Sequence, residues 1–389
     1  MSTPGSPSSP RSNPLLELAE LGQSVWLDFI RRSLLDSGEL ARLIADDGIR
    51  GVTSNPAIFE KAIGAGDEYS AQILAVAPGV GGDPRRIFEA LAVEDVRRAA
   101  DLLAGVHRAS EGADGFVSLE VAPDLADDAE ATAAEARRLW AAVDRPNLMI
   151  KVPGTAAGVP AVRRLLADGI HVNVTLLFSR RAYADIAEAH LAALEERVAR
   201  GLAVDRVASV ASFFVSRIDT LVDRWLEERA AAAVGRARER LLALRGRVAI
   251  ANAKLAYRHY RQLVAGERWR ALALRGARPQ RLLWASTSTK NPAYRDTLYA
   301  EELIGPDTVD TMPPETVVAF RDHGRARPTL AAGVEEAVAT LAELETLGVS
   351  LERATDELLA DGIAKFVQPY VKLLDAVAAR SRELAGKAG

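Results

Sequence analysis

Short apolar runs and longer amphipathic segments alternate along most of this chain, and the alternation predicts a succession of strands and helices. Brief apolar runs are typical of buried strands, whereas apolar residues recurring at the spacing of a helical turn indicate a helix. The predicted strands are Val25–Phe29, Gly51–Ser54, Gly115–Val121, Leu148–Val152, Ile170–Leu176, Arg206–Phe214, Gln280–Ala285 and Val309–Met312. The predicted helices are Leu15–Leu21, Ser37–Asp46, Ala57–Ala77 (interrupted by glycines), Asp83–Ala109, Asp127–Val143, Gly158–Ala167, Ser179–Arg200, Ile218–Ala233, Arg236–Val264 and Gly333–Lys387.

Eight predicted strands, each followed by helical sequence, indicate an α/β fold of the (β/α)8 TIM barrel type with additional helices. A doubly wound open sheet gives the same alternation and is the structural alternative. No Gly-x-Gly-x-x-Gly pattern follows the first strand, and the segment Gly154–Gly158 lacks the P-loop pattern. Both observations favour the barrel over a nucleotide-binding sheet. The helical stretch Arg236–Val264 is longer than one β/α unit needs, and the sequence does not explain it.

Polar residues occupy alternating positions near the carboxyl ends of several predicted strands. Side chains of a strand alternate between its two faces, and the outer face of a barrel strand must be apolar because it meets helices. The polar set is therefore expected to point into the barrel, where branched apolar side chains are usual. These residues are Asp28, Glu120, Lys151, Asn173 and Thr175. Active sites of this fold are built at the carboxyl ends of the strands, so the pattern predicts an active site there.

A lysine lies within the apolar strand sequence at Lys151, which is followed by the turn residues Pro153 and Gly154. Burying an ammonium is costly unless the group is paired or loses its proton. A neutral amine in a dry site is the nucleophile that forms Schiff bases with carbonyl substrates. The structural alternative is a lysine at a strand end whose amine reaches solvent.

Composition narrows the classes of function. The 389-residue chain has a net charge of −4, so it lacks the broad basic surface of a nucleic-acid-binding protein. It has no cysteine, which excludes disulfides and thiolate chemistry, and its five histidines do not cluster as metal ligands would. No apolar run is long enough to span a bilayer. We therefore expect a soluble, cytoplasmic protein with no metal, no nucleic-acid partner and no membrane partner.

The two ends of the chain suggest a simple domain organisation. Residues 1–14 are rich in Ser, Pro and Gly and lack an apolar core, so they are expected to form a disordered leader. Residues 15–389 are expected to form one barrel domain that includes the C-terminal helix. The oligomeric state is not readable from the sequence, and a monomer and a homodimer both stay open.

Six segments in order resemble the transaldolase family, from about Leu21 to Pro314. The lysine strand and the Asn-x-Thr-Leu-x-Phe-Ser strand are the most specific of them, whereas Thr-Ser-Asn-Pro alone is a weak signal. The segments are Gly51–Pro56, Leu119–Val121, Met149–Pro153, Asn173–Ser179, Ser212–Arg217 and Ala285–Pro292.

The resemblance implies roles for four catalytic residues. Lys151 forms a Schiff base with the C2 carbonyl of a ketose phosphate. Asp28 moves the proton of the hydroxyl that is released when the C3–C4 bond breaks. Glu120 and Thr175 hold a water that shuttles protons while the Schiff base forms. No metal and no organic cofactor is implied.

The resemblance also implies six substrate-binding residues, which are Asn55, Asn173, Ser212, Arg217, Ser288 and Lys290. Asn55 and Asn173 bind the dihydroxyacetone unit, and Ser212 lies in the same cleft. Arg217, Ser288 and Lys290 form a phosphate clamp. The best-known members carry arginine where this chain has Lys290, and a lysine meets a phosphate as a point charge instead of a bidentate fork.

Three functions follow as hypotheses. The leading one is a transferase that moves a dihydroxyacetone unit from sedoheptulose 7-phosphate to glyceraldehyde 3-phosphate in the pentose phosphate pathway, giving erythrose 4-phosphate and fructose 6-phosphate. The second is a Schiff-base aldolase of the fructose-6-phosphate type, which releases free dihydroxyacetone. The third is a phosphosugar-binding or scaffolding barrel, which is disfavoured because Lys151, Asp28 and Glu120 are all present.

Overall fold

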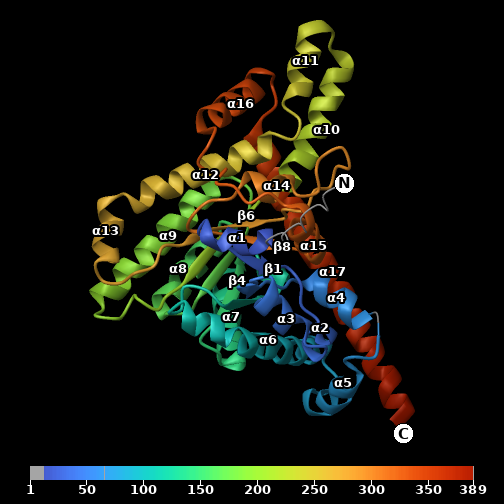
Figure 1. Ribbon diagram of the computed structural model, residues 1–389. Coiled ribbons are helices and arrows are strands. Elements are labelled where there is room, and N and C mark those ends of the chain that lie inside the picture. Colours follow the sequence, from blue (N-terminus) through green and yellow to red (C-terminus); the bar gives the residue numbers. More distant parts are fainter. Residues whose placement is uncertain (1–12, 65, 389) are drawn as a thin grey trace, which may run out of the picture.

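The computed structural model describes residues 13–64 and 66–388, and its centre is a closed barrel of eight parallel strands in sequence order (Figure 1). The first strand pairs with both the second and the last, so the barrel is confirmed and the open sheet is excluded. The strands are β1 (Gln23–Leu27), β2 (Gly51–Val52), β3 (Phe116–Glu120), β4 (Leu148–Pro153), β5 (Val172–Leu177), β6 (Ser209–Phe214), β7 (Arg281–Ala285) and β8 (Thr308–Met312).

Helices surround the barrel and extend beyond it (Figure 1). The α-helices are α1 (Pro14–Glu20), α2 (Arg32–Asp36), α3 (Glu39–Asp46), α4 (Pro56–Gly64), α5 (Ser70–Val76), α6 (Pro84–Ala109), α7 (Ala129–Val143), α8 (Gly158–Asp168), α9 (Arg180–Ala199), α10 (Ser216–Ala232), α11 (Gly235–Ala243), α12 (Val248–Val264), α13 (Glu267–Ala273), α14 (Leu298–Glu302), α15 (Pro314–His323), α16 (Val334–Thr346) and α17 (Leu351–Ala388). Two short 3₁₀ helices are η1 (Ala77–Val80) and η2 (Pro123–Leu125). No helix in the described ranges is long and apolar enough to cross a membrane.

The expected leader lies outside the described residues except for its last two positions. The side chain of Asn13 accepts a hydrogen bond from the backbone N–H of Leu15 at 3.0 Å and caps α1. Pro14 occupies the first helical position, where its missing N–H costs nothing. Asn13 also donates to Asp47 at 2.8 Å, which ties the start of α1 to the end of α3.

Two helices predicted as continuous are broken, so those predictions are wrong in extent. The stretch 236–264 divides into α11 and α12, and the stretch 333–387 into α16 and α17. The stretch 57–77, which was predicted as helical with glycines interrupting it, divides into α4, α5 and η1. Two of the breaks contain a glycine in the left-handed region, Gly246 at φ 71° and Gly348 at φ 73°. Such glycines end helices because they carry no Cβ to clash there. Amphipathic periodicity continues across these turns, so it does not reveal them.

The missing side chain of Gly51 in β2 leaves room for a large side chain in the barrel. The indole of Trp26 in β1 is fully buried, and its Nε1 donates to Asp114 at 2.9 Å. A Cβ at Gly51 would lie 2.5 Å from the ring of Trp26, so only glycine fits beside the indole. Trp26 thus fills the barrel interior, with its Nε1 bonded to Asp114 just before β3, at the amino end of the strands.

The C-terminal helix α17 lies against several parts of the molecule (Figure 1). It packs on α4, α5, α6 and α10 and reaches β5. Phe366, Tyr370, Leu373 and Val377 are buried on one helical face. A Cβ at Gly362 would lie 3.1 Å from Leu176, so a glycine at this position allows α17 to approach the end of β5 closely. The last helix of the chain therefore borders the carboxyl end of the barrel.

Candidate active site

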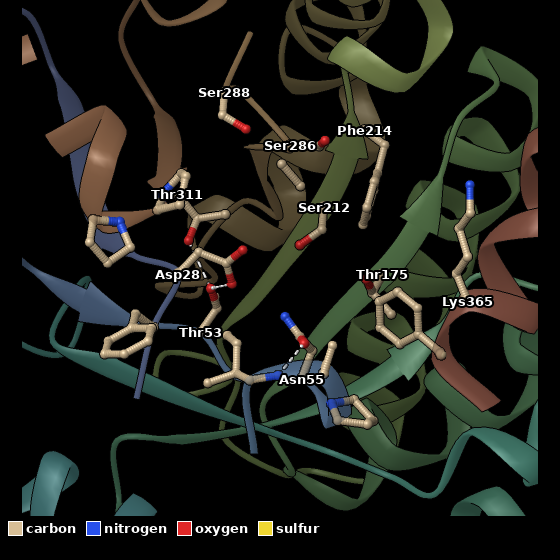
Figure 2. Close-up of a pocket in the computed structure, with 18 of the residues that line it drawn as sticks. Asp28, Thr53, Asn55, Thr175, Ser212, Phe214, Ser286, Ser288, Thr311 and Lys365 are labelled. Atoms are coloured by element: carbon tan, nitrogen blue, oxygen red, sulfur yellow. Dashed lines mark hydrogen bonds between the residues drawn. The ribbon is translucent and has the colours of Figure 1, made fainter. Parts of the chain in front are cut away.

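The carboxyl ends of the strands open into a cavity of about 690 Å³ (Figure 2). Eight of the ten predicted site residues line it, namely Asp28, Asn55, Lys151, Thr175, Ser212, Arg217, Ser288 and Lys290. The other two, Glu120 and Asn173, are held by residues of the cavity wall. The structure therefore brings together residues from β3 to β6 and from the segments after β1, β2, β6 and β7.

Lys151 lies in β4 between two of the predicted site residues. Strand register places it opposite Glu120 of β3 and Asn173 of β5. Its Nζ atom is 3.6 Å from Oε2 of Glu120, and the two side chains are only 7% and 6% exposed. Nζ also donates to the carbonyl oxygen of Ser54 at 3.1 Å and lies 5.7 Å from the ring centre of Phe366. A buried amine beside a carboxylate is thus confirmed, and the alternative of a lysine that reaches solvent is wrong.

Glu120 is the acid whose environment differs most from water among the predicted catalytic residues. Burial raises its pKa to about 7, and the neighbouring Lys151 opposes this rise only in part. Its Oε2 and the hydroxyl of Thr175 are both buried without a hydrogen-bond partner among the described residues. Near neutral pH this carboxyl can therefore both accept and donate a proton.

Asn173 supports the cavity wall instead of lining it. Its Nδ2 donates to Ser118 at 3.0 Å, and its Oδ1 accepts a hydrogen bond from Ser212 at 2.6 Å. The Asn173 side chain is fully buried. Of the three hydrogen-bonded residues Ser118, Asn173 and Ser212, only Ser212 lines the cavity. Asn173 is therefore positioned to orient the Ser212 hydroxyl.

Asp28 is held from both neighbouring strands just beyond the end of β1. Its backbone N–H donates to the carbonyl of Met312 at 2.8 Å, and Thr53 donates to its Oδ1 at 2.7 Å. Thr53 and Thr311 also share a hydrogen bond of 2.8 Å. Figure 2 shows this group on the side of the cavity opposite Lys365. The fixed carboxylate faces the space in which a substrate would lie.

Three predicted residues, Arg217, Ser288 and Lys290, form what we call the cationic end of the cavity. The Arg217 guanidinium lies 5.3 Å from the ring centre of Phe214, and burial lowers its pKa below the ordinary arginine value. One of its terminal nitrogens, Nη1, is buried without a hydrogen-bond partner among the described residues. Nζ of Lys290 donates to the Ser288 hydroxyl at 2.5 Å. These donors suit an anionic group such as a phosphate.

Two residues beside the cavity adopt a backbone conformation that is uncommon for non-glycine residues. Leu176 has φ 60° and lies at a register shift between β5 and β6, so the regular alternation predicted through Leu176 is wrong at that position. Ser286, directly after β7, has φ 57° and lines the cavity. Strained backbone of this kind clusters at functional sites, where the surrounding structure enforces it.

Several residues of the cavity were not identified from the sequence. Thr53 and Thr311 look like ordinary strand-end threonines, and nothing in their segments indicates that they hold Asp28. Lys365 and Phe366 come from α17, far from the other site residues in the chain, and only the fold brings them to the cavity. Lys365 is paired with Asp361 at 2.6 Å on the exposed side of the helix. Within the described ranges, no three or more acidic or histidine side chains gather as a metal ion would require.

Fold and site together define a class of protein, a (β/α)8 barrel with a buried lysine–carboxylate pair at the carboxyl end of its strands. The model of the Transaldolase/Fructose-6-phosphate aldolase family matches residues 25–377, and the chain belongs to that family. A transaldolase of Trichodesmium erythraeum is 44% identical over 96% of this chain and 99% of its own. Transaldolase 2 of Nostoc sp. is 47% identical over 94% of this chain and 97% of its own. The Thermobifida fusca transaldolase is 48% identical over 94% of this chain and 98% of its own. The predicted family and the predicted kind of enzyme are confirmed.

Proposed function

We propose that the protein transfers a dihydroxyacetone unit from sedoheptulose 7-phosphate to glyceraldehyde 3-phosphate, giving erythrose 4-phosphate and fructose 6-phosphate. The observation that carries this proposal is the buried amine of Lys151, 3.6 Å from Glu120 at the wall of a cavity with a cationic end. An amine reacts with the ketone of a sugar, and the cationic end binds its phosphate. The near full-length relatives named transaldolase support the same reaction.

Binding orients the donor along the cavity. Arg217, Ser288 and Lys290 hold the phosphate, which directs the ketone toward Lys151. Asn55 and Ser212 bind hydroxyl groups of the dihydroxyacetone unit, and Asn173 acts with them by orienting Ser212. Holding the reacting groups in place removes much of the entropic cost of the reaction.

Schiff-base formation uses Lys151 and Glu120. The amine attacks C2 of the ketose, the carbonyl oxygen becomes a hydroxyl, and that hydroxyl leaves as water while a C=N bond forms. Glu120, whose pKa is about 7, takes the proton released by the amine and returns it to the leaving hydroxyl. The hydroxyl of Thr175 and Oε2 of Glu120, which have no hydrogen-bond partner in the part of the chain that the structure describes, are suited to hold the water that carries these protons.

Cleavage and transfer then use Asp28. Its carboxylate takes the proton of the C4 hydroxyl, the C3–C4 bond breaks, and its electron pair moves into the protonated imine to form an enamine. The aldehyde product leaves and glyceraldehyde 3-phosphate takes its place. The same steps in reverse form the new C–C bond, and Asp28 returns its proton to the new hydroxyl.

The aldolase alternative shares every step up to the enamine. It differs only afterwards, because water hydrolyses the Schiff base and free dihydroxyacetone is released. Measuring free dihydroxyacetone in the absence of an acceptor separates the two activities. The similarity to relatives named transaldolase favours transfer.

The first test is borohydride trapping with fructose 6-phosphate, followed by peptide mass mapping. A reduced three-carbon or six-carbon adduct on the peptide that carries Lys151 is the expected result, and Lys151→Met should abolish it. A folded protein that forms no adduct would exclude both enzyme activities and favour a binding function.

We further propose that the reaction belongs to the pentose phosphate pathway and takes place in the cytoplasm. No metal and no organic cofactor enters these steps, since the imine itself accepts the electrons. Whether the active form is a monomer or a homodimer is measured by light scattering.

A further inference from the structure

The cationic end of the cavity depends on a loop between β7 and α14, residues 286–297, which we call the clamp loop. Ser288 and Lys290 belong to it, whereas Arg217 stands in the first turn of α10. A phosphate can be bound by all three only if the loop is held at a fixed distance from α10. The contacts of the clamp loop therefore decide how well the site is formed.

The first residues of the clamp loop are fastened to strands and to the start of α10. Ser286 shares a hydroxyl–hydroxyl hydrogen bond of 3.0 Å with Ser216, and Thr287 donates to the buried Asp310 of β8 at 2.8 Å. Lys290 lies beyond these contacts and is exposed. The contacts of Ser286 and Thr287 hold only the start of the clamp loop. The position of Lys290 therefore depends on the second half of the loop.

The second half is fastened by Tyr294. Its hydroxyl donates to Oδ2 of Asp223 at 2.6 Å, and Asp223 lies on α10, the helix whose first turn carries Arg217. Oδ1 of the same carboxylate accepts the backbone N–H of Gly246 at 3.1 Å, in the turn between α11 and α12. A Cβ at Gly246 would lie 2.9 Å from the tyrosine ring, so the ring rests directly on that turn.

We propose that Tyr294 is a positioning residue for the phosphate site, holding Lys290 and Ser288 opposite Arg217 through its bond to Asp223. The hydrogen bond to a carboxylate joins the clamp loop to α10, so one helix carries Arg217 and also anchors the loop with the second cation. The extra helical segment 236–264 gains a role, because its Gly246 turn supports the tyrosine ring and shares Asp223. This inference rests on the proposed function.

The test compares Tyr294→Phe with Tyr257→Phe. Tyr257 donates to the carbonyl of Pro306 at 3.1 Å from α12, so the control removes another part-buried tyrosine hydrogen bond, away from the cavity. For Tyr294→Phe we expect a rise of about ten-fold in KM for fructose 6-phosphate with kcat within about two-fold, because ground-state binding is weakened. Binding of inorganic phosphate, measured by calorimetry, should weaken to a similar extent. Borohydride trapping of Lys151 with unphosphorylated dihydroxyacetone should not change.

Two results would overturn the inference. One is a Tyr294→Phe protein whose KM and phosphate affinity equal those of the parent. The other is a parallel fall in kcat and in dihydroxyacetone trapping, which would indicate general damage to the fold. A parent protein that shows no transfer but binds phosphate, with weaker binding in Tyr294→Phe, would instead count against the proposed function while supporting the positioning role.

Discussion

Two carboxyl groups of the site stand in different environments, and the difference matches different tasks. Glu120 is buried without a hydrogen bond to its Oε2 among the described residues, which raises its pKa to about 7. Asp28 instead accepts a hydrogen bond from Thr53 and faces the cavity. The environment of Glu120 suits proton exchange with water during imine formation. The environment of Asp28 suits removal of a proton from a sugar hydroxyl.

Glu120→Gln should remove the proton exchange while keeping the shape of the side chain. The deprotonated fraction of Glu120 grows as pH rises through about 7, so the parent kcat should increase from about pH 6 to about pH 8. For the variant we expect a kcat lower by about 10²-fold and a flat profile over this range, measured by steady-state transfer assays. If kcat of the variant still rises with pH over this range, a group other than Glu120 titrates.

Asp28→Asn should separate Schiff-base formation from C–C cleavage. The amide cannot take the proton of the C4 hydroxyl, so transfer should fall by about 10²- to 10⁴-fold. Trapping of fructose 6-phosphate on Lys151 by borohydride should persist, as a six-carbon adduct in the mass map. Equal loss of trapping and transfer would place Asp28 in imine formation instead.

At the scale of elements, local patterns predicted which residues of a strand face the barrel interior. They did not predict which distant segments of the chain pack against the end of the strand. Lys151 and Thr175 could be assigned to the interior because strand alternation is a local property. The left-handed backbone of Leu176 could not be predicted, because the register shift between β5 and β6 at this position arises only when the strands pair. Short helices such as α2 and α14 were missed since they contain too few turns for a periodic signal.

The contact between α17 and the amine of Lys151 gives an element-scale prediction. Phe366 is 8% exposed and its ring centre lies 5.7 Å from Nζ of Lys151. Replacing it by leucine should admit water to the enamine, so the release of free dihydroxyacetone per transfer should rise about two- to five-fold. Tyr370→Leu, one turn further along α17 and outside this cavity, should not change the ratio. Equal ratios in all three proteins would show that Phe366 does not exclude water.

At the scale of the whole molecule, the barrel closes only when β1 pairs with β8, so contacts far apart in sequence hold it together. The fold class followed from the order of the elements, which is why it was predictable. The positions of the clamp loop and of α17 were not predictable, because they depend on packing between segments that are distant in the sequence. The single domain expected for residues 15–389 stays a prediction, and one calorimetric transition is the expected result.

Buried acid groups should make stability depend on pH. Asp310 is fully buried, and burial raises its pKa from 3.8 to about 7. Between these values the folded state binds more protons than the unfolded state, so the free energy of unfolding contributed by this group falls as pH rises. Asp310→Asn keeps an acceptor for Thr287 but does not titrate. Its stability relative to the parent, from urea unfolding, should increase from about pH 4 to about pH 7, and parallel curves would contradict the assignment.

The position of α17 after all eight strands in the sequence has a consequence for biosynthesis. The ribosome makes every strand of the barrel before it makes Lys365 and Phe366, which complete the cavity beside Lys151. Because segments fold as they emerge, a nascent chain can close its barrel while the reactive amine is still uncovered. Phe366 covers the amine only after α17 has been made, so the barrel can form before its cavity is complete.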